Sequence, residues 1–177
     1  MRTQAILGLT LTLLFAGCNR ESSTRDTSSG SSEAGSALDA QAKAAGILPD
    51  SSNIKFAGRF ETRGDLGTDK FCAVKSAGAE HIVGVLAVFG PDSKCEGKGT
   101  ATINGEKVSI ALQGKDSCNF NAEFDGVELR FPGAMQPGCA SYCSDRASLS
   151  GTSYFMVEQG DDNARRTLGR DIPKLCG

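Results

Sequence analysis

The sequence predicts an all-β domain, a small antiparallel barrel of seven or eight strands followed by a short C-terminal helix. Asn104-Gly105 and Asp125-Gly126 each separate two segments of alternating apolar and polar residues. Such dipeptides are the strongest local signal for tight hairpins. The apolar run of residues 82–89 is typical of a strand that is covered on both faces. A two-sheet β-sandwich is the alternative arrangement of these strands.

Three strands are expected in the first half of this domain. In residues 54–62, apolar or small residues alternate with polar ones, as in a half-buried strand. Residues 70–75 and 80–89 are the second and third expected strands. Gly84 lies inside the third strand, where we expect it to mark a bend or a bulge.

The two glycine turns predict a register for the four-strand meander that contains them. A two-residue Asn104-Gly105 turn would place Ala101 opposite Val108, and the second turn would place Ala122 opposite Leu129. Each hairpin then has one continuous apolar face. A slip by one residue would turn that face to water, so the inward face should be well specified.

The end of the domain is less regular. Residues 146–157 are expected to form a long last strand, one face of which carries Ala147, Leu149, Gly151, Ser153 and Phe155. Residues 161–169 are expected to form a short helix, because acids occupy the first turn, arginines follow, and a glycine stands at the end.

The N-terminus predicts export. The apolar run of residues 5–16 is too short to span a bilayer permanently and matches the apolar part of a signal peptide. It ends in Leu14-Phe15-Ala16-Gly17-Cys18, which resembles the bacterial lipoprotein signal, in which a cysteine is lipidated and becomes the mature N-terminus. The resemblance implies a signal peptide at residues 1–17 and a membrane anchor, including palmitate, on Cys18. An ordinary secretory signal is the alternative.

Asn19 follows the cysteine, and no aspartate stands there. By resemblance to enterobacterial lipoproteins, this implies the periplasmic leaflet of the outer membrane. Residues 18–53 are expected to be a disordered tether, because residues 21–35 are rich in Ser, Thr and Gly and lack large apolar residues. Residues 36–46 could form a short, marginal helix. The folded domain is expected to comprise residues 54–177.

Cysteine usage also fits an exported protein. Of seven cysteines, six remain after Cys18, and an even set predicts a disulfide framework. We expect three bridges, Cys72 with Cys95, Cys118 with Cys139, and Cys143 with Cys176. A metal site is not expected, because the sequence has no Cys-x-x-Cys pair and one histidine. No cofactor motif is present.

No residue pattern predicts catalysis. The net charge is −2 at pH 7, with no block of like charge, so a nucleic-acid partner is not indicated. His81 lies beside Glu80 without a nucleophile motif, and we expect it at the surface or at a strand edge. Glu123 and Glu128 could be a pair of acids, but we expect them on a solvated outer face. We therefore expect no enzyme.

Residues 149–154, Leu-Ser-Gly-Thr-Ser-Tyr, resemble the Ser-Gly-x-x-Tyr segment of membrane-bound C-type lysozyme inhibitors, which are lipoproteins with small antiparallel barrels. The resemblance implies an inhibitory loop with Ser150, Gly151 and Tyr154 as binding residues. The aromatic-Lys-Gly segment that follows in that family is absent, and residues 157–160 read Val-Glu-Gln-Gly. The same residues also fit an ordinary strand.

These observations predict a calycin-like barrel that acts as a non-catalytic, cell-envelope module, binding or inhibiting an envelope or host protein. Carriage of a small apolar ligand is the alternative. A cavity of several hundred Å³ with converging polar groups would favour carriage. A packed interior with a protruding loop at residues 132–144 or 150–154 would favour protein binding.

Overall fold

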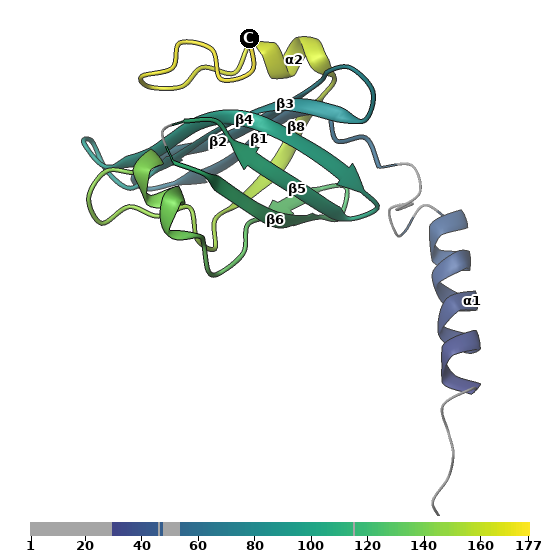
Figure 1. The fold of residues 1–177 in the computed structure, drawn as a ribbon. Helices are drawn as coiled ribbons and strands as arrows, with labels where there is room; N and C mark the ends of the chain where they lie inside the picture. The colour runs from purple at the N-terminus through teal and green to yellow at the C-terminus, as the bar shows by residue number, and fades with distance from the viewer. Residues whose placement is uncertain (1–29, 46, 48–53, 115) are drawn as a thin grey trace, which may run out of the picture. The chain divides into compact units, whose positions relative to one another are not determined.

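The computed structural model describes residues 30–45, 47, 54–114 and 116–177. The expected signal peptide, Cys18 and much of the expected tether lie outside these residues. Helix α1 comprises Gly30–Ala44 (Figure 1), so it is longer than the helix expected at residues 36–46 and begins inside the segment expected to be disordered. Its alanines favour a helix although residues 35–41 are exposed. No helix among the described residues is long and apolar enough to cross a bilayer.

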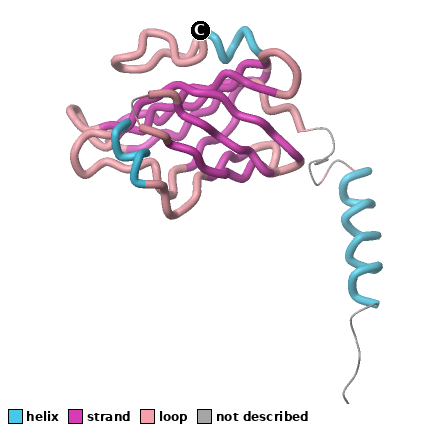
Figure 2. The backbone as a smooth tube through the Cα atoms, viewed as in Figure 1, coloured by secondary structure: helices cyan, strands magenta, loops and turns pink. Residues whose placement is uncertain are grey.

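Eight antiparallel strands close into a barrel in sequence order, with β1 paired to β8 (Figures 1 and 2). The strands are β1 (Gly58–Gly64), β2 (Gly67–Lys75), β3 (Glu80–Val88), β4 (Lys94–Asn104), β5 (Lys107–Leu112), β6 (Cys118–Phe124), β7 (Glu128–Arg130) and β8 (Ser153–Gln159). The expected small antiparallel barrel is confirmed. The sandwich alternative is wrong, because closure leaves a single continuous sheet.

Aromatic rings fill the barrel interior. Neighbouring rings lie 4.7 to 6.1 Å apart, mostly tilted or edge to face. The buried rings are Phe56, Phe60, Phe71, Phe120, Phe124, Phe131 and Tyr154. These side chains fill the interior of the barrel, as is usual for barrels of eight strands.

Both glycine hairpins differ from the expected register by two residues. Ala101 lies opposite Ile110, and Phe124 lies opposite Leu129. In the first hairpin, Gly105 has a φ of 60° and is the first central residue of the turn, the position that a type II′ turn gives to glycine. Because side chains alternate with a period of two, a shift by two keeps the same residues inward. The expected apolar face is therefore right, although the expected partners are wrong.

A second apolar cluster lies on the outside of the barrel. Figure 1 shows helix α2 (Asp161–Arg165) and the C-terminal segment running along this outer side. Leu175 and Cys176 pack there against the outward-facing Val74 and Leu86. From Val83 to Val88 the apolar run is thus covered on both faces, as expected, whereas Ile82 and Phe89 at its two ends are each 37 % exposed. Helix α2 is shorter than the expected 161–169, because the chain turns back and the Leu175 N–H bonds to the Thr167 carbonyl at 3.0 Å.

Gly84 does not mark a bulge. It pairs in continuous register with both neighbouring strands. A Cβ at this position would lie 2.5 Å from the carbonyl oxygen of Leu175, so the glycine gives room for the C-terminal segment. The irregularity in the barrel falls instead between β1 and β8, at Arg59 and Phe60.

The three disulfides join Cys72 to Cys176, Cys95 to Cys143, and Cys118 to Cys139. The expected Cys118–Cys139 bridge is found, and the other two expected pairs are wrong. Cys72 belongs to the outer cluster, whereas Cys95 belongs to the barrel interior. Two cysteines on opposite faces of a sheet cannot meet without moving the backbone. Each is bonded instead to a later segment on its own side.

Candidate binding surface

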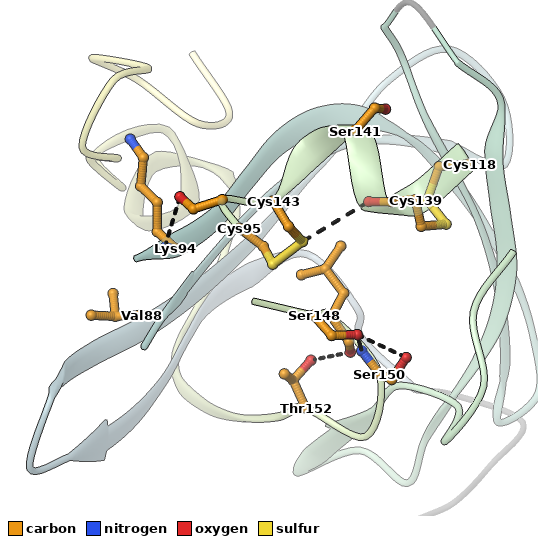
Figure 3. Close-up of a disulfide and its surroundings, with 12 residues drawn as sticks. Val88, Lys94, Cys95, Cys118, Cys139, Ser141, Cys143, Ser148, Ser150 and Thr152 are labelled. Atoms are coloured by element: carbon orange, nitrogen blue, oxygen red, sulfur yellow. Dashed lines mark hydrogen bonds between the residues drawn. A yellow bond between two sulfur atoms is a disulfide. The ribbon is translucent and has the colours of Figure 1, made fainter. Parts of the chain in front are cut away.

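The connection between β7 and β8, residues 131–152, is fixed to the barrel by two of the disulfides. It contains the 3₁₀ helix η2 (Pro137–Tyr142), whose Cys139 is bonded to Cys118 at the start of β6. Cys143 follows η2 and is bonded to Cys95 of β4 (Figure 3). Next to that bridge, the Ser144 N–H donates to the Lys94 carbonyl at 2.8 Å. Residues 132–144, where a protruding loop would have favoured protein binding, are therefore held against the strands.

Tyr142 fixes the end of η2 in the same way. Its hydroxyl donates to the Asp116 carbonyl at 3.2 Å. Its ring occupies the space beside two glycines, since a Cβ would lie 2.8 Å from the ring at Gly97 and 2.5 Å from the hydroxyl at Gly114. Tyr142 is therefore a packing residue of the connection.

The residues predicted from the inhibitor resemblance do not form one exposed loop. Ser150 and Gly151 lie in a turn, where the Ser148 Oγ accepts the Ser150 N–H at 3.0 Å and Gly151 has a φ of 70° (Figure 3). Ser150 is half-buried and Gly151 is exposed. Tyr154 is 0 % exposed inside the barrel, and this burial raises its pKa. Only the first two residues can meet a partner without a change of structure.

The last strand is shorter than expected. It begins at Ser153, and two turns precede it, one at Arg146 with a φ of 66° and one at Gly151 with a φ of 70°. The alternation that begins at Ala147 therefore does not continue into β8. Tyr154 and Met156 point to the core, whereas Phe155 is 44 % exposed, so the prediction that Phe155 shares a face with Leu149 is wrong.

Val157 is a second outward apolar residue beside Phe155, and it lies at a β-bulge. Arg59 pairs with Glu158 and Phe60 pairs with Met156, which leaves Val157 without a partner on β1. Val157 is 47 % exposed. Phe155 and Val157 are two residues apart on β8, so the alternation of the strand places both on its outer face, close together. Val127, 58 % exposed, adjoins them, because its carbonyl accepts the Met156 N–H at 2.8 Å.

Ion pairs flank this apolar surface on both sides. Glu61 of β1 and Glu128 of β7 are the two cross-strand neighbours of Phe155. Arg59 contacts Glu61 at 2.5 Å and Glu158 at 3.1 Å. On the other side, Arg130 contacts Glu128 at 2.5 Å. We define the β8 face as the apolar residues Val127, Phe155 and Val157 with the charged residues Arg59, Glu61, Glu128, Arg130 and Glu158.

The sequence contains one signal for this surface that the strand prediction missed. Residues 154–157, Tyr-Phe-Met-Val, are apolar without alternation, as in β3. In β3 the C-terminal segment covers the outward residues. No part of the described chain covers Phe155 and Val157, which are therefore 44 % and 47 % exposed.

The groups considered for chemistry lie apart from the β8 face or within its ion pairs. His81 is 8 % exposed and pairs with both neighbouring strands, so the prediction of a histidine at the surface or at a strand edge is wrong. Glu123 is exposed, and Glu128 is half-buried in its pair with Arg130. In the described part of the chain, no group of three or more His, Cys, Asp or Glu residues is arranged to hold a metal ion.

Comparisons with known proteins give no further guide. The chain matches no protein-family model, and no curated protein or solved structure is detectably similar to it.

Proposed function

We propose that this protein is a cell-envelope lipoprotein whose barrel is a non-catalytic protein-binding module. In this proposal Cys18 carries the lipid and holds the protein on the periplasmic leaflet of the outer membrane. The partner is an envelope or host protein that docks on the β8 face. Its complementary surface would be apolar at the centre and would carry both signs of charge at the edge.

The observation that supports this best is the exposure of Phe155 and Val157 between ion-paired strands. Exposed single apolar residues are ordinary, but adjacent ones framed by charges are typical of docking sites. Fully burying one such side chain contributes about 1.5–3 kcal/mol. The surrounding charges would add specificity more than affinity.

The packed interior favours this function over carriage of an apolar ligand inside the barrel. Phe60, Phe71 and Phe124 are each 0 % exposed and occupy the centre. A ligand at the centre would have to displace aromatic rings that are already packed against one another, as in a close-packed protein core.

A binding experiment can test the proposal with the full chain carrying Cys18→Ser, which removes the acylation site. Immobilised protein is incubated with envelope extract and crosslinked, in the original form and as two variants. Phe155→Ser should lose the captured partner. Phe89→Ser is the matched control, because Phe89 is 37 % exposed and lies outside the β8 face, and it should retain the partner. Equal capture by both variants contradicts a role for the β8 face.

The inhibitor form of the proposal has its own assay. The same Cys18→Ser chain is added to C-type lysozyme in a cell-wall lysis assay. Inhibition that depends on the Ser150–Gly151 turn would identify lysozyme as the target. No inhibition at large molar excess removes lysozyme from consideration.

The anchor is tested by fractionation. Cells expressing the original chain should hold it in the membrane fraction, and cells expressing Cys18→Ser should release it to the soluble envelope fraction. Continued membrane association of the variant contradicts the lipid anchor.

A further inference from the structure

A pocket of about 550 Å³ opens at one end of the barrel. Its walls come from the residues just before β1, the β2–β3 turn, and the ends of β4 and β8. Pockets that hold small molecules in proteins have volumes of about 300–1,000 Å³, so this one is large enough for a ligand. It shares no residue with the β8 face.

The floor of the pocket is apolar and closed. Phe56 is 2 % exposed, and its ring lies 5.4 to 5.9 Å from the rings of Phe60, Phe71 and Phe124. It therefore separates the pocket from the barrel interior. Ile103, at the last inward position of β4, adds a half-buried apolar side chain to the lining.

The polar groups of the pocket are cationic or uncharged. Lys55 and Lys75 line it, and both are exposed. No carboxylate is among the described residues of the lining, although the whole chain has a net charge of −2. The carboxylate of Asp161 stands nearby, where its Oδ1 accepts the Lys75 backbone N–H at 2.9 Å, and its charge offsets part of the positive charge of the two lysines.

His81 adds an uncommon feature to the wall. It pairs with Lys75 across β2 and β3 and packs edge-on against Phe56, with the ring centroids 5.3 Å apart. Its Nδ1 is buried and has no hydrogen-bond partner among the described residues. Buried polar groups without a partner are rare in folded proteins, and an ordered water in the pocket would satisfy this one.

We propose that this pocket binds a small amphiphile with an apolar body and an anionic head, such as a medium-chain carboxylate. The body lies on Phe56 and Ile103, where water is displaced from apolar surface. The head lies toward Lys55 and Lys75 at the open side, where it stays partly hydrated. A cationic amphiphile of the same length would meet two like charges there, so the pocket discriminates by the charge of the head.

The first test is a titration with decanoate, below its micelle concentration, followed by amide chemical shifts of the full chain carrying Cys18→Ser. Shifts should concentrate at Lys75, the β2–β3 turn and the residues just before β1. Decyltrimethylammonium is the matched probe of opposite charge and should bind at least about threefold more weakly, because ion pairs near a surface contribute modestly. Absence of decanoate binding, or equal binding of both probes, overturns the proposal.

Two pairs of variants locate the site. Ala79→Trp puts a ring into the pocket from an exposed position and should weaken decanoate binding at least about tenfold, which corresponds to the loss of a few buried methylene groups. Ala77→Trp, in the same turn but outside the lining, should bind as before. Lys75→Glu should weaken binding more than Lys107→Glu, which makes the same charge change on β5. Unchanged binding in both Ala79→Trp and Lys75→Glu overturns the proposal. If Ala79→Trp does not fold, the comparison of Lys75→Glu with Lys107→Glu tests the site by itself, and equal decanoate affinity of these two variants overturns the proposal.

Discussion

Gly84 of β3 and Leu175 of the C-terminal segment lie so close together that no side chain fits between them. A Cβ at Gly84 would lie 2.5 Å from the Leu175 carbonyl oxygen and 2.6 Å from the Leu175 Cβ. Leu175 is 0 % exposed, and the neighbouring Cys176 is bonded to Cys72 of β2. The C-terminal segment thus acts as a cover for the outer faces of β2 and β3.

Replacing Gly84 by alanine should push this cover away from the strand. We expect Gly84→Ala to lower the free energy of unfolding by about 1–3 kcal/mol, because backbone atoms cannot yield as a flexible side chain would. Gly133→Ala is the control, since a Cβ there meets nothing within 4 Å. Urea denaturation measures both variants, and an equal effect of the two would show that Gly84 is not a contact position.

Glu96 holds the same segment through hydrogen bonds. Its carboxylate accepts the backbone N–H groups of Arg170, Asp171 and Ile172 at 2.8 to 3.1 Å, and the Lys94 ammonium at 2.8 Å. Burial alone would raise the pKa of Glu96. The bond from Lys94 and the three backbone bonds outweigh burial and hold that pKa below its usual value of 4.5.

The stabilisation from Glu96 should therefore depend on pH. A carboxyl group whose pKa is lowered in the folded state stabilises it above the unfolded pKa, and this contribution is lost as the pH falls through the folded value. Glu96→Gln should unfold about 1–3 kcal/mol more easily at pH 7, as expected for charge-assisted hydrogen bonds. The difference from the original chain should shrink below pH 4.5. Glu123→Gln, an exposed control on β6, should show no such convergence in denaturation curves between pH 7 and pH 3.

The fold was predictable because its signals are local and tolerant of error. Alternation fixes which residues point inward, and this set does not change when a hairpin shifts by two residues, as both glycine hairpins do. The turns at Gly105 and Gly126 require φ values of 60° and 98°, which glycine adopts without strain. Closure of β1 on β8 is a long-range contact, and no local pattern records it.

The disulfides and the candidate surface were harder to predict because they depend on which side chains face the barrel interior and which face outward. Spacing along the chain does not tell whether Cys72 faces the interior or the outside, and the tail that meets it is 104 residues away. Phe155 and Val157 point outward because Tyr154 points inward, and this phase of β8 does not follow from the residues before Ser153. His81 reads as a polar residue in sequence, but its register position places it inward.

Loss of the Cys72–Cys176 bridge should destabilise the protein more than loss of the Cys118–Cys139 bridge. The sequence separations are 104 and 21 residues. In the chain-entropy model, the Cys72–Cys176 bridge raises the free energy of the unfolded state by about 4.7 kcal/mol and the Cys118–Cys139 bridge by about 3.4 kcal/mol. The two double alanine variants are compared by denaturation. In limited proteolysis, only the variant without Cys72 and Cys176 should be cut early at Arg170 or Lys174. Early cleavage in neither variant would mean that the bridge is not what retains the segment.

His81 should make the free energy of unfolding depend on pH near and below pH 6.5, a higher range than the one in which Glu96 acts. Burial is the main cause that lowers its pKa below 6.5, and Lys75 lowers it further, while the negative charge of Asp161 acts in the other direction. As the pH falls below 6.5, the unfolded chain takes up a proton first, so the folded state loses stability by up to about 1.4 kcal/mol for each pH unit by which the pKa is lowered. Above pH 6.5 both states are neutral and the effect vanishes.

Since the chain has one histidine, its imidazole resonances can be followed by NMR without ambiguity. His81→Gln should flatten the dependence of the unfolding free energy between pH 7 and pH 5, and titration of folded His81 at or above pH 6.5 would contradict its burial beside Lys75.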